Sequence, residues 1–236
     1  MVKVYSARLV LRIAVFTAGI SIYLTDRNSL LLSGGLSLDH GIKPLHILWL
    51  ILASGMIQKL FPLPVMSMGC RKQFKSSYAP GAREPGDPEL SAWAKGENRA
   101  ARKVLAAWLS VNAAPAVLYF AGVLGESEMV LLSLVYYACD PICLLFYCPF
   151  QSFLMKNRCC VTCRIFNWDS MMILTPLIVI PSPFSWSLIL FALIILIRWE
   201  MAFQRHPRRF WEESNQNLQC AHCRERICRV KRSLPQ

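Results

Sequence analysis

The sequence is poor in charge. Asp, Glu, Lys and Arg make up only 17% of its 236 residues, whereas 55% are hydrophobic and the mean hydropathy is +0.38. Soluble globular chains contain about 25% charged residues, and here the apolar residues stand in long runs of the kind that cross membranes. The shortage of charge therefore argues against a soluble domain and predicts an integral membrane protein.

Negative charge is the scarcer sign, because 14 Asp and Glu stand against 26 Lys and Arg, a formal net charge of +12. A basic chain can bind nucleic acid, but no recognition motif for it accompanies these residues. They flank the apolar runs instead of forming one patch, which is typical of membrane orientation and of contact with anionic lipids. We expect anionic lipid or a partner protein at the cytoplasmic face, and no nucleic acid.

Several functional signatures are missing as well. The chain has no P-loop, no His-Glu-x-x-His helix and no nucleophile elbow. No small-residue cleavage site follows the first apolar stretch, so we expect a retained first span and not a cleaved signal peptide. The sequence gives no sign of an enzyme.

The apolar runs predict an all-α, polytopic membrane bundle of six transmembrane helices with both termini cytoplasmic. The membrane domain is expected at 1–204 and a basic, cysteine-containing cytoplasmic tail at 205–236. A polar cytoplasmic loop is expected at 62–103, and the helix that begins there at Asp87-Pro88-Glu89, with Asp87 as its N-cap, should run towards the third span. The predicted spans are residues 7–24, 44–61, 104–124, 129–153, 165–180 and 184–204.

The region from Arg164 to Trp199 has two interpretations, one long kinked helix or two helices around Pro181-Ser182-Pro183. Prolines on both sides of a serine disfavour a continuous helix, although an arm of residues 165–180 is short for a crossing. With two helices, nearly every Lys and Arg lies on one side, as the positive-inside rule requires. We therefore predict two crossings in this region.

Two Cys-x-x-Cys motifs dominate the cysteine pattern, Cys160-Val161-Thr162-Cys163 in a loop and Cys220-Ala221-His222-Cys223 in the tail. On the predicted topology both face the reducing cytoplasm, where structural disulfides are rare. Paired Cys-x-x-Cys motifs are typical of tetrahedral four-thiolate zinc sites. We therefore predict a zinc site that joins Cys160, Cys163, Cys220 and Cys223.

Alternatives to zinc remain open at this stage. Cys159 and Cys228 are alternate ligands that would suit an iron or iron–sulfur centre, although the close cysteine spacing of a ferredoxin is missing. His222 lies inside the second motif and is a further alternate. The thiols could also be redox-active, or simply reduced cysteines with no ligand.

Asp140 stands in the middle of the fourth predicted span, where an ionised carboxylate is costly and marks a candidate functional residue. Asn112 in the third span is expected at a similar depth, and a contact between the two would be structural. A proton or transport role for Asp140 is the other interpretation. Arg12 is expected to reach the headgroups, and Arg205, Arg208 and Arg209 to contact anionic lipid.

Two segments resemble a known group of proteins. The stretch MKNRCCVTCRIFNWD at 155–169 is similar to a segment of an uncharacterised family of bacterial multi-pass membrane proteins, and HPRRFWE at 206–212, with the terminal cysteine motif, is similar to its tail. The resemblance implies a bacterial inner-membrane location and no particular chemistry.

Three functions follow from these patterns. The first is a non-enzymatic scaffold, regulatory or accessory membrane protein whose zinc site clips helix ends together. The second is a membrane redox protein with an iron or thiol centre. The third is a small proton-coupled permease that uses Asp140.

Overall fold

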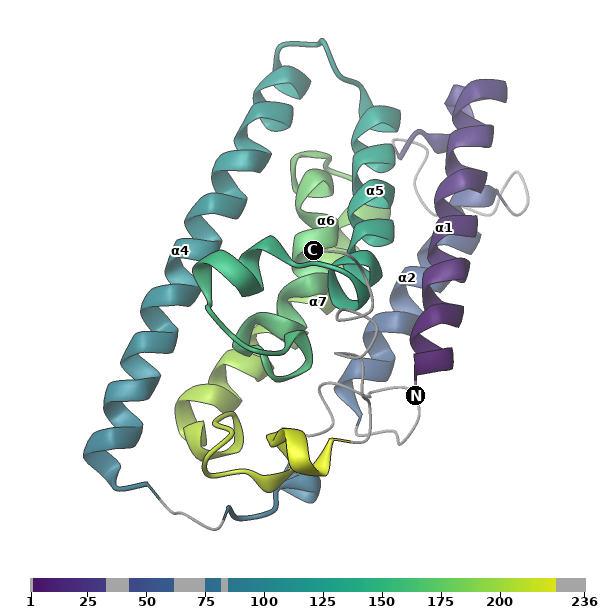
Figure 1. Ribbon diagram of the computed structural model, residues 1–236. Helices are drawn as coiled ribbons and strands as arrows, with labels where there is room; N and C mark the ends of the chain where they lie inside the picture. The colour runs from purple at the N-terminus through teal and green to yellow at the C-terminus, as the bar shows by residue number, and fades with distance from the viewer. Residues whose placement is uncertain (1, 33–42, 62–74, 82–84, 224–236) are drawn as a thin grey trace.

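The computed structural model describes residues 2–32, 43–61, 75–81 and 85–223, and in these ranges every regular element is helical (Figure 1). The predicted all-α class is therefore confirmed. Four helices are long and apolar enough to cross a membrane, which supports an integral membrane protein: Lys3–Thr25, Asp87–Phe120, Glu126–Leu145 and Pro183–Arg205. Six crossings and the side on which the termini lie stay predictions.

The first two helices lie close to their predicted positions. α1 covers Val2–Thr25, a few residues more than the expected 7–24. α2 covers Pro44–Leu60 and begins at its proline, because a first-turn proline lacks only an N–H that would have had no partner in the helix. At 17 residues, α2 is about 26 Å long, slightly less than a ~30 Å hydrocarbon core.

α4 covers Asp87–Phe120 and unites the helix expected in the 62–103 loop with the third predicted span. Its N-cap is Gly86 and not the predicted Asp87. Pro115 lies inside the helix without ending it. The helix ends four residues before the predicted boundary at 124, because the chain turns at Gly122, whose φ of +74° favours glycine.

α5 covers Glu126–Leu145 and ends well before the predicted boundary at 153. Pro149 explains the difference, because its ring would clash with the carbonyl of residue 145 if the helix continued. A separate π-helical turn, Phe150–Leu154, follows and folds back towards α4. There the rings of Phe150 and Trp108 have centroids 5.9 Å apart.

The region after residue 163 is a hairpin. A first arm of three short helices, Arg164–Trp168 (η5), Asp169–Leu174 (α6) and Thr175–Val179 (η6), precedes the long helix α7, Pro183–Arg205. Trp199 Nε1 in α7 donates to the carbonyl of Arg164 at 2.8 Å, so the two arms are antiparallel. The single kinked helix is excluded, while a bilayer crossing by the first arm stays a prediction.

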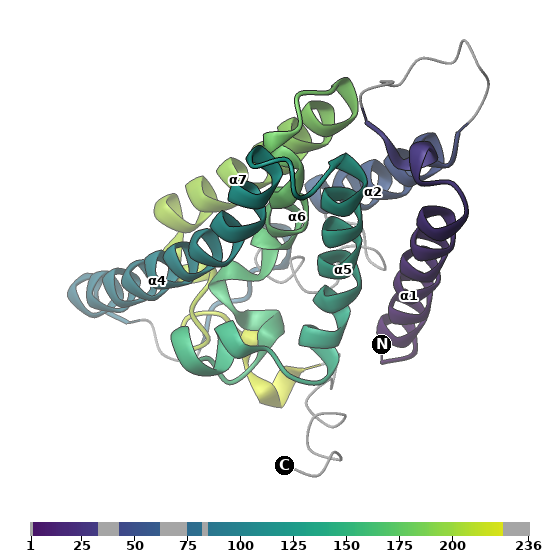
Figure 2. The ribbon, with the colours of Figure 1, turned by 90° about the horizontal axis from the view of Figure 1, so that it is seen from above.

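The helices pack into a bundle with α4 at one side and α1 at the other, and α5 and the hairpin lie between them (Figures 1 and 2). α1 and α5 are in close contact, since a Cβ added to Gly19 would stand 2.4 Å from Leu134 Cδ1. Such small residues let membrane helices approach closely. Near the Thr25 end, Tyr23 donates to Glu128 at 2.6 Å in the same antiparallel register.

The described part of the tail packs against the first turns of α4 and against the 75–81 segment. The rings of Trp211 and Trp93 of α4 are stacked, with centroids 5.2 Å apart and planes 8° apart. An isolated antiparallel bridge joins Asn215 to Pro80, and a Cβ on Gly81 would stand 2.2 Å from the carbonyl oxygen of Glu213. The tail up to residue 223 is therefore ordered against the 75–81 segment and α4.

Candidate functional site

Each predicted cysteine motif folds into one 3-10 turn. These turns are η4, Cys160–Thr162, and η9, Cys220–His222. The N–H of Cys163 donates to the Cys160 carbonyl at 3.1 Å, and the N–H of Cys223 donates to the Cys220 carbonyl at 3.2 Å. The two motifs therefore share a compact backbone conformation.

The structure does not assemble the predicted zinc site. Within the described residues, no three His, Cys, Asp or Glu side chains are arranged to hold a metal ion. Cys163 is only 3% exposed, whereas Cys220 and His222 are exposed. Burial raises the pKa of Cys163 to about 12, so this thiol is protonated at neutral pH. The alternate ligand Cys228 lies outside the described residues.

Cys160 and Cys163 instead share a cavity with cysteines of α5 and of the segment that follows it. The cavity has a volume of about 180 Å³ and is lined by five cysteine side chains: Cys139, Cys143, Cys148, Cys160 and Cys163. The side chains of Cys143 and Cys148 lie close enough to interact electrostatically. The Cys160 thiol donates to Gln151 Oε1 at 3.1 Å. Sequence analysis missed this cluster because it placed Cys148 inside a continuous span.

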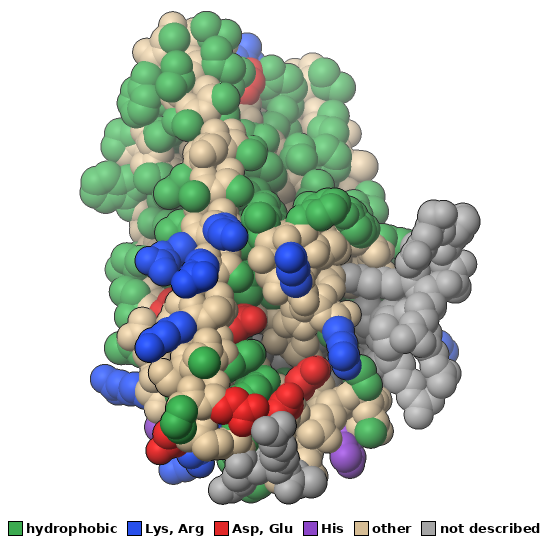
Figure 3. Space-filling view, turned by 60° about the vertical axis from the view of Figure 1, so that its left-hand side comes forward, with side chains coloured by type: hydrophobic (Ala, Val, Ile, Leu, Met, Phe, Trp, Pro, Cys, Tyr) green, Lys and Arg blue, Asp and Glu red, His purple; other side chains and the backbone are tan. Residues whose placement is uncertain are grey.

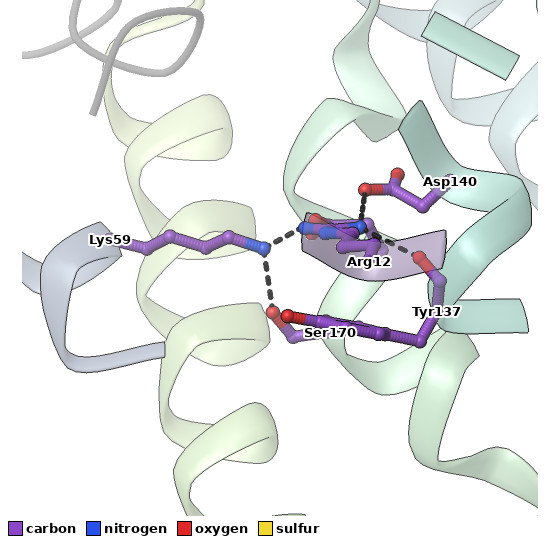
Figure 4. A network of polar contacts seen from close by, with 6 residues as sticks. Arg12, Lys59, Tyr137, Asp140 and Ser170 are labelled. Carbon is purple, nitrogen blue, oxygen red and sulfur yellow. Dashed lines mark hydrogen bonds and ion pairs between the residues drawn. The ribbon is translucent and has the colours of Figure 1, made fainter. Parts of the chain in front are cut away.

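Asp140 forms an ion pair with Arg12 of α1 (Figure 4). Arg12 also donates to the Tyr137 carbonyl at 3.1 Å, and its guanidinium carbon lies 4.4 Å from the centre of the Tyr137 ring. The expectation that Arg12 reaches the headgroups is therefore wrong. Asn112 donates to the Trp108 carbonyl within α4 at 2.9 Å, and the structure shows no contact between it and Asp140.

A second ion pair, between Lys59 of α2 and Asp169 at the start of α6, lies beside the first. Lys59 also donates to the Ser170 hydroxyl at 2.8 Å, as the close-up shows (Figure 4). Four helical elements thus contribute two opposite-charge pairs to one polar cluster. Buried charges in a bundle are tolerated when they are paired in this way. Sequence analysis missed the second pair because Lys59 and Asp169 stand near predicted span ends.

A groove of about 840 Å³ runs between α4 and the α6–α7 hairpin. Its basic lining residues are Lys95, Arg99, Arg102 and Arg164. Its apolar lining residues are Leu105, Trp108, Leu109, Met171, Met172, Ile178 and Leu196. Figure 3, which brings the α4 side forward, shows Lys and Arg side chains gathered over the lower half and hydrophobic side chains above them.

The three tail arginines lie at the end of α7 and in the 3-10 turn that follows it, Pro207–Arg209. Arg208 donates to Asp87 at the start of α4 at 2.8 Å. The backbone carbonyl of Arg209 accepts a hydrogen bond from Asn215 at 2.8 Å, and Arg205, at the end of α7, is exposed. The predicted lipid contact of these residues stays a prediction.

Comparisons with protein-family models, with curated proteins and with solved structures find no match for this chain. The resemblance to a bacterial membrane family therefore stays a prediction, and function has to be argued from the geometry alone.

Proposed function

We propose that this chain is a six-span helical protein of the bacterial inner membrane that binds an anionic lipid of the cytoplasmic leaflet. The lipid would occupy the groove between α4 and the α6–α7 hairpin, and both termini would be cytoplasmic. In this role the protein is a non-enzymatic scaffold or accessory protein.

The main support for the proposal is that the side chains along one face of α4 change from basic to apolar. Lys95, Arg99 and Arg102 stand at helical spacing on this face, and Leu105 and Leu109 continue it. The stretch from 95 to 109 is about 21 Å long at 1.5 Å per residue. A basic half followed by an apolar half matches a phosphate headgroup followed by an acyl chain.

The basic half is available for a ligand. Lys95, Arg99 and Arg102 are exposed, and none has an ion pair with any residue that the structure describes. Arg164 at the far wall is only 4% exposed and is already paired with Glu200. Each basic residue near an anionic membrane surface contributes about 1 kcal/mol.

The apolar half faces the region where lipid tails would lie. Leu105 and Leu109 are 45% and 53% exposed, which is unfavourable in water but not in a bilayer. The opposite wall carries Met171, Met172 and Leu196. Methionine side chains are flexible and suit an irregular acyl chain.

The orientation rests on charge. The predicted cytoplasmic loop 62–103 and the tail 205–236 together carry 16 of the 26 Lys and Arg, and the antiparallel hairpin puts Arg164 and Arg205 at the same end of the bundle. Basic flanks stay cytoplasmic. Green fluorescent protein fused after Gln236 should fluoresce, since it matures in the cytoplasm, and a dark but intact fusion would refute this orientation.

Native mass spectrometry of the detergent-solubilised protein with added phosphatidylglycerol tests lipid binding. The variant Lys95→Gln/Arg99→Gln/Arg102→Gln should lose about 3 kcal/mol of lipid affinity, on the order of a hundredfold in Kd. The comparison variant Arg205→Gln/Arg208→Gln/Arg209→Gln removes the same charge from the tail arginines that were predicted to contact lipid, and it should lose less lipid affinity than the groove variant. Unchanged binding by the groove variant, or loss only in the tail variant, would refute the proposal.

A second candidate function is a zinc site that joins the two cysteine motifs and so holds helix ends together. The 3-10 turn that both motifs form favours it. Metal binding often completes folding at such sites, so Cys160, Cys163, Cys220 and Cys223 would have to converge when zinc binds. Elemental analysis of protein purified without chelators should then find about one zinc per chain. A value near zero, with no iron or visible absorption band, would eliminate this candidate.

A further inference from the structure

The cavity lined by five cysteines lies directly beside the lipid groove. Trp108 and Met172 line both spaces, so they form the wall between them. The cavity therefore lies one side-chain layer from the surface where lipid-soluble molecules would arrive. Lipid binding does not use this cavity, and of its five cysteines the zinc site would use only Cys160 and Cys163.

Two of its thiols are close neighbours. α5 ends at Leu145, and the turn before Pro149 brings Cys148 back to the cavity that Cys143 also lines, where the two side chains interact. A continuous helix would place residues five apart on different faces. Proximity of two thiols is the geometric precondition for a disulfide.

A third thiol stands next to the pair. The Cys160 thiol donates to Gln151 Oε1 at 3.1 Å and lies 3.7 Å from the Cys143 carbonyl oxygen. The Gln151 N–H in turn donates to Cys148 Sγ at 3.5 Å. Gln151 thus contacts both thiols, Cys148 through its backbone N–H and Cys160 through its side-chain oxygen. A neighbouring thiol is the group that opens a disulfide by exchange.

We propose that Cys143 and Cys148 form a redox-active dithiol that is oxidised by a lipid-soluble quinone. In this step two S–H bonds break and one S–S bond forms. The two electrons and two protons pass to the quinone, whose two carbonyl oxygens become hydroxyls of the quinol. Cys160 then attacks this disulfide by exchange: a new S–S bond forms between Cys160 and either Cys143 or Cys148, the first S–S bond breaks, and the other cysteine leaves as a thiol, with no net change of oxidation state.

The charges around the cavity fit this chemistry. Asp140 and Asp169 also line the cavity, but their carboxylates are paired with Arg12 and Lys59. The remaining lining is largely apolar and aromatic, with Trp108, Tyr136 and Phe150 near the thiols. Such a lining suits a neutral quinone ring, whereas a charged oxidant would be excluded.

The test uses the full-length reduced protein in lipid nanodiscs, with a short-chain ubiquinone analogue as the probe. Quinol formation is followed by ultraviolet absorbance, and disulfides are mapped by alkylation and mass spectrometry. We expect about one quinol per chain and a Cys143–Cys148 disulfide, because one dithiol carries two electrons. Cys143→Ser and Cys148→Ser should each abolish the reaction.

Cys159→Ser is the control, since Cys159 is next to Cys160 in the chain but does not line the cavity. This variant should produce quinol as wild type does. No quinol from the folded wild-type protein, an equal loss in Cys159→Ser, or a disulfide that includes neither Cys143 nor Cys148 would overturn the proposal. The groove variant Lys95→Gln/Arg99→Gln/Arg102→Gln should still reduce the quinone, so failure of lipid binding and failure of the dithiol can be told apart.

Discussion

Arg12 of α1 and Asp140 of α5 form an ion pair between two antiparallel helices. Arg12 stands 13 residues before the end of α1 and Asp140 stands 14 residues after the start of α5, so each is about 20 Å from the end where the two helices meet the short 3-10 helix Arg27–Leu30. The equal depth fixes the register of the two helices. It also satisfies the charge of Asp140 without any transport role.

Removal of one member of this pair should destabilise the protein. Asp140→Leu would leave the Arg12 charge without its partner, and breaking a buried pair costs about 3–5 kcal/mol. The double variant Arg12→Met/Asp140→Leu should recover most of that loss, since it leaves no unpaired charge. Thermal unfolding in detergent micelles measures both. Asp87→Asn is the control, because the Asp87–Arg208 pair is solvent-exposed, and a loss in the control as large as in Asp140→Leu would contradict the account.

Gly19 should tolerate no larger residue. A Cβ there would stand 2.4 Å from Leu134 Cδ1, so Gly19→Val should separate α1 from α5 and lower the thermal midpoint. Overpacking of this kind costs about 1–3 kcal/mol. Gly55→Ala in α2 is the matched control, because a Cβ there has no atom within 4 Å. Equal effects of the two substitutions would show that the α1–α5 contact is not tight.

The tail should be released when its aromatic contact is removed. Trp211 stacks on Trp93, and Phe210 packs edge-on against Trp199 at 5.0 Å. Trp211→Ala should increase hydrogen exchange across residues 206–223, since an aromatic pair contributes about 0.5–1.5 kcal/mol beyond its buried area. Trp186→Ala, at a position 62% exposed, should leave exchange in the tail unchanged. Equal exchange in wild type and Trp211→Ala would refute docking through this stack.

Cys163 should resist alkylation while Cys220 reacts. Burial raises the pKa of Cys163 to about 12 from 9.0, so its thiol stays protonated at about pH 8, where only thiolates react quickly. Because the folded-state pKa lies above the unfolded-state value, this group contributes its full stability below pH 9 and loses it as the pH rises towards 12. Mass spectrometry after timed iodoacetamide treatment measures both rates, and modification of Cys163 as fast as Cys220 would contradict the burial.

Local sequence signals predicted a large part of the fold. Pro44 marked the start of α2, and Pro181-Ser182-Pro183 marked the hairpin, because prolines act on the chain next to them. The early end of α5 was also encoded locally by Pro149, but the apolar residues around it concealed the break.

The contacts between helices could not be predicted in the same way. The Arg12–Asp140 and Lys59–Asp169 pairs depend on the register between helices far apart in the sequence, which no local pattern determines. The groove between α4 and the α6–α7 hairpin likewise depends on the distance between these elements. The choice of Cys143 and Cys148 as partners for Cys160 follows from the turn after α5 and not from Cys-x-x-Cys spacing.

The most direct test of lipid binding is photocrosslinking in bilayers with an anionic phospholipid that carries a diazirine on its acyl chain. The account predicts that mapped crosslinks concentrate on the apolar half of the groove, at Leu105, Leu109, Met171, Met172 and Leu196, and that a zwitterionic analogue gives few crosslinks there. Crosslinks spread evenly over other exposed positions such as Val117 and Leu190, with no preference for the anionic lipid, would contradict it.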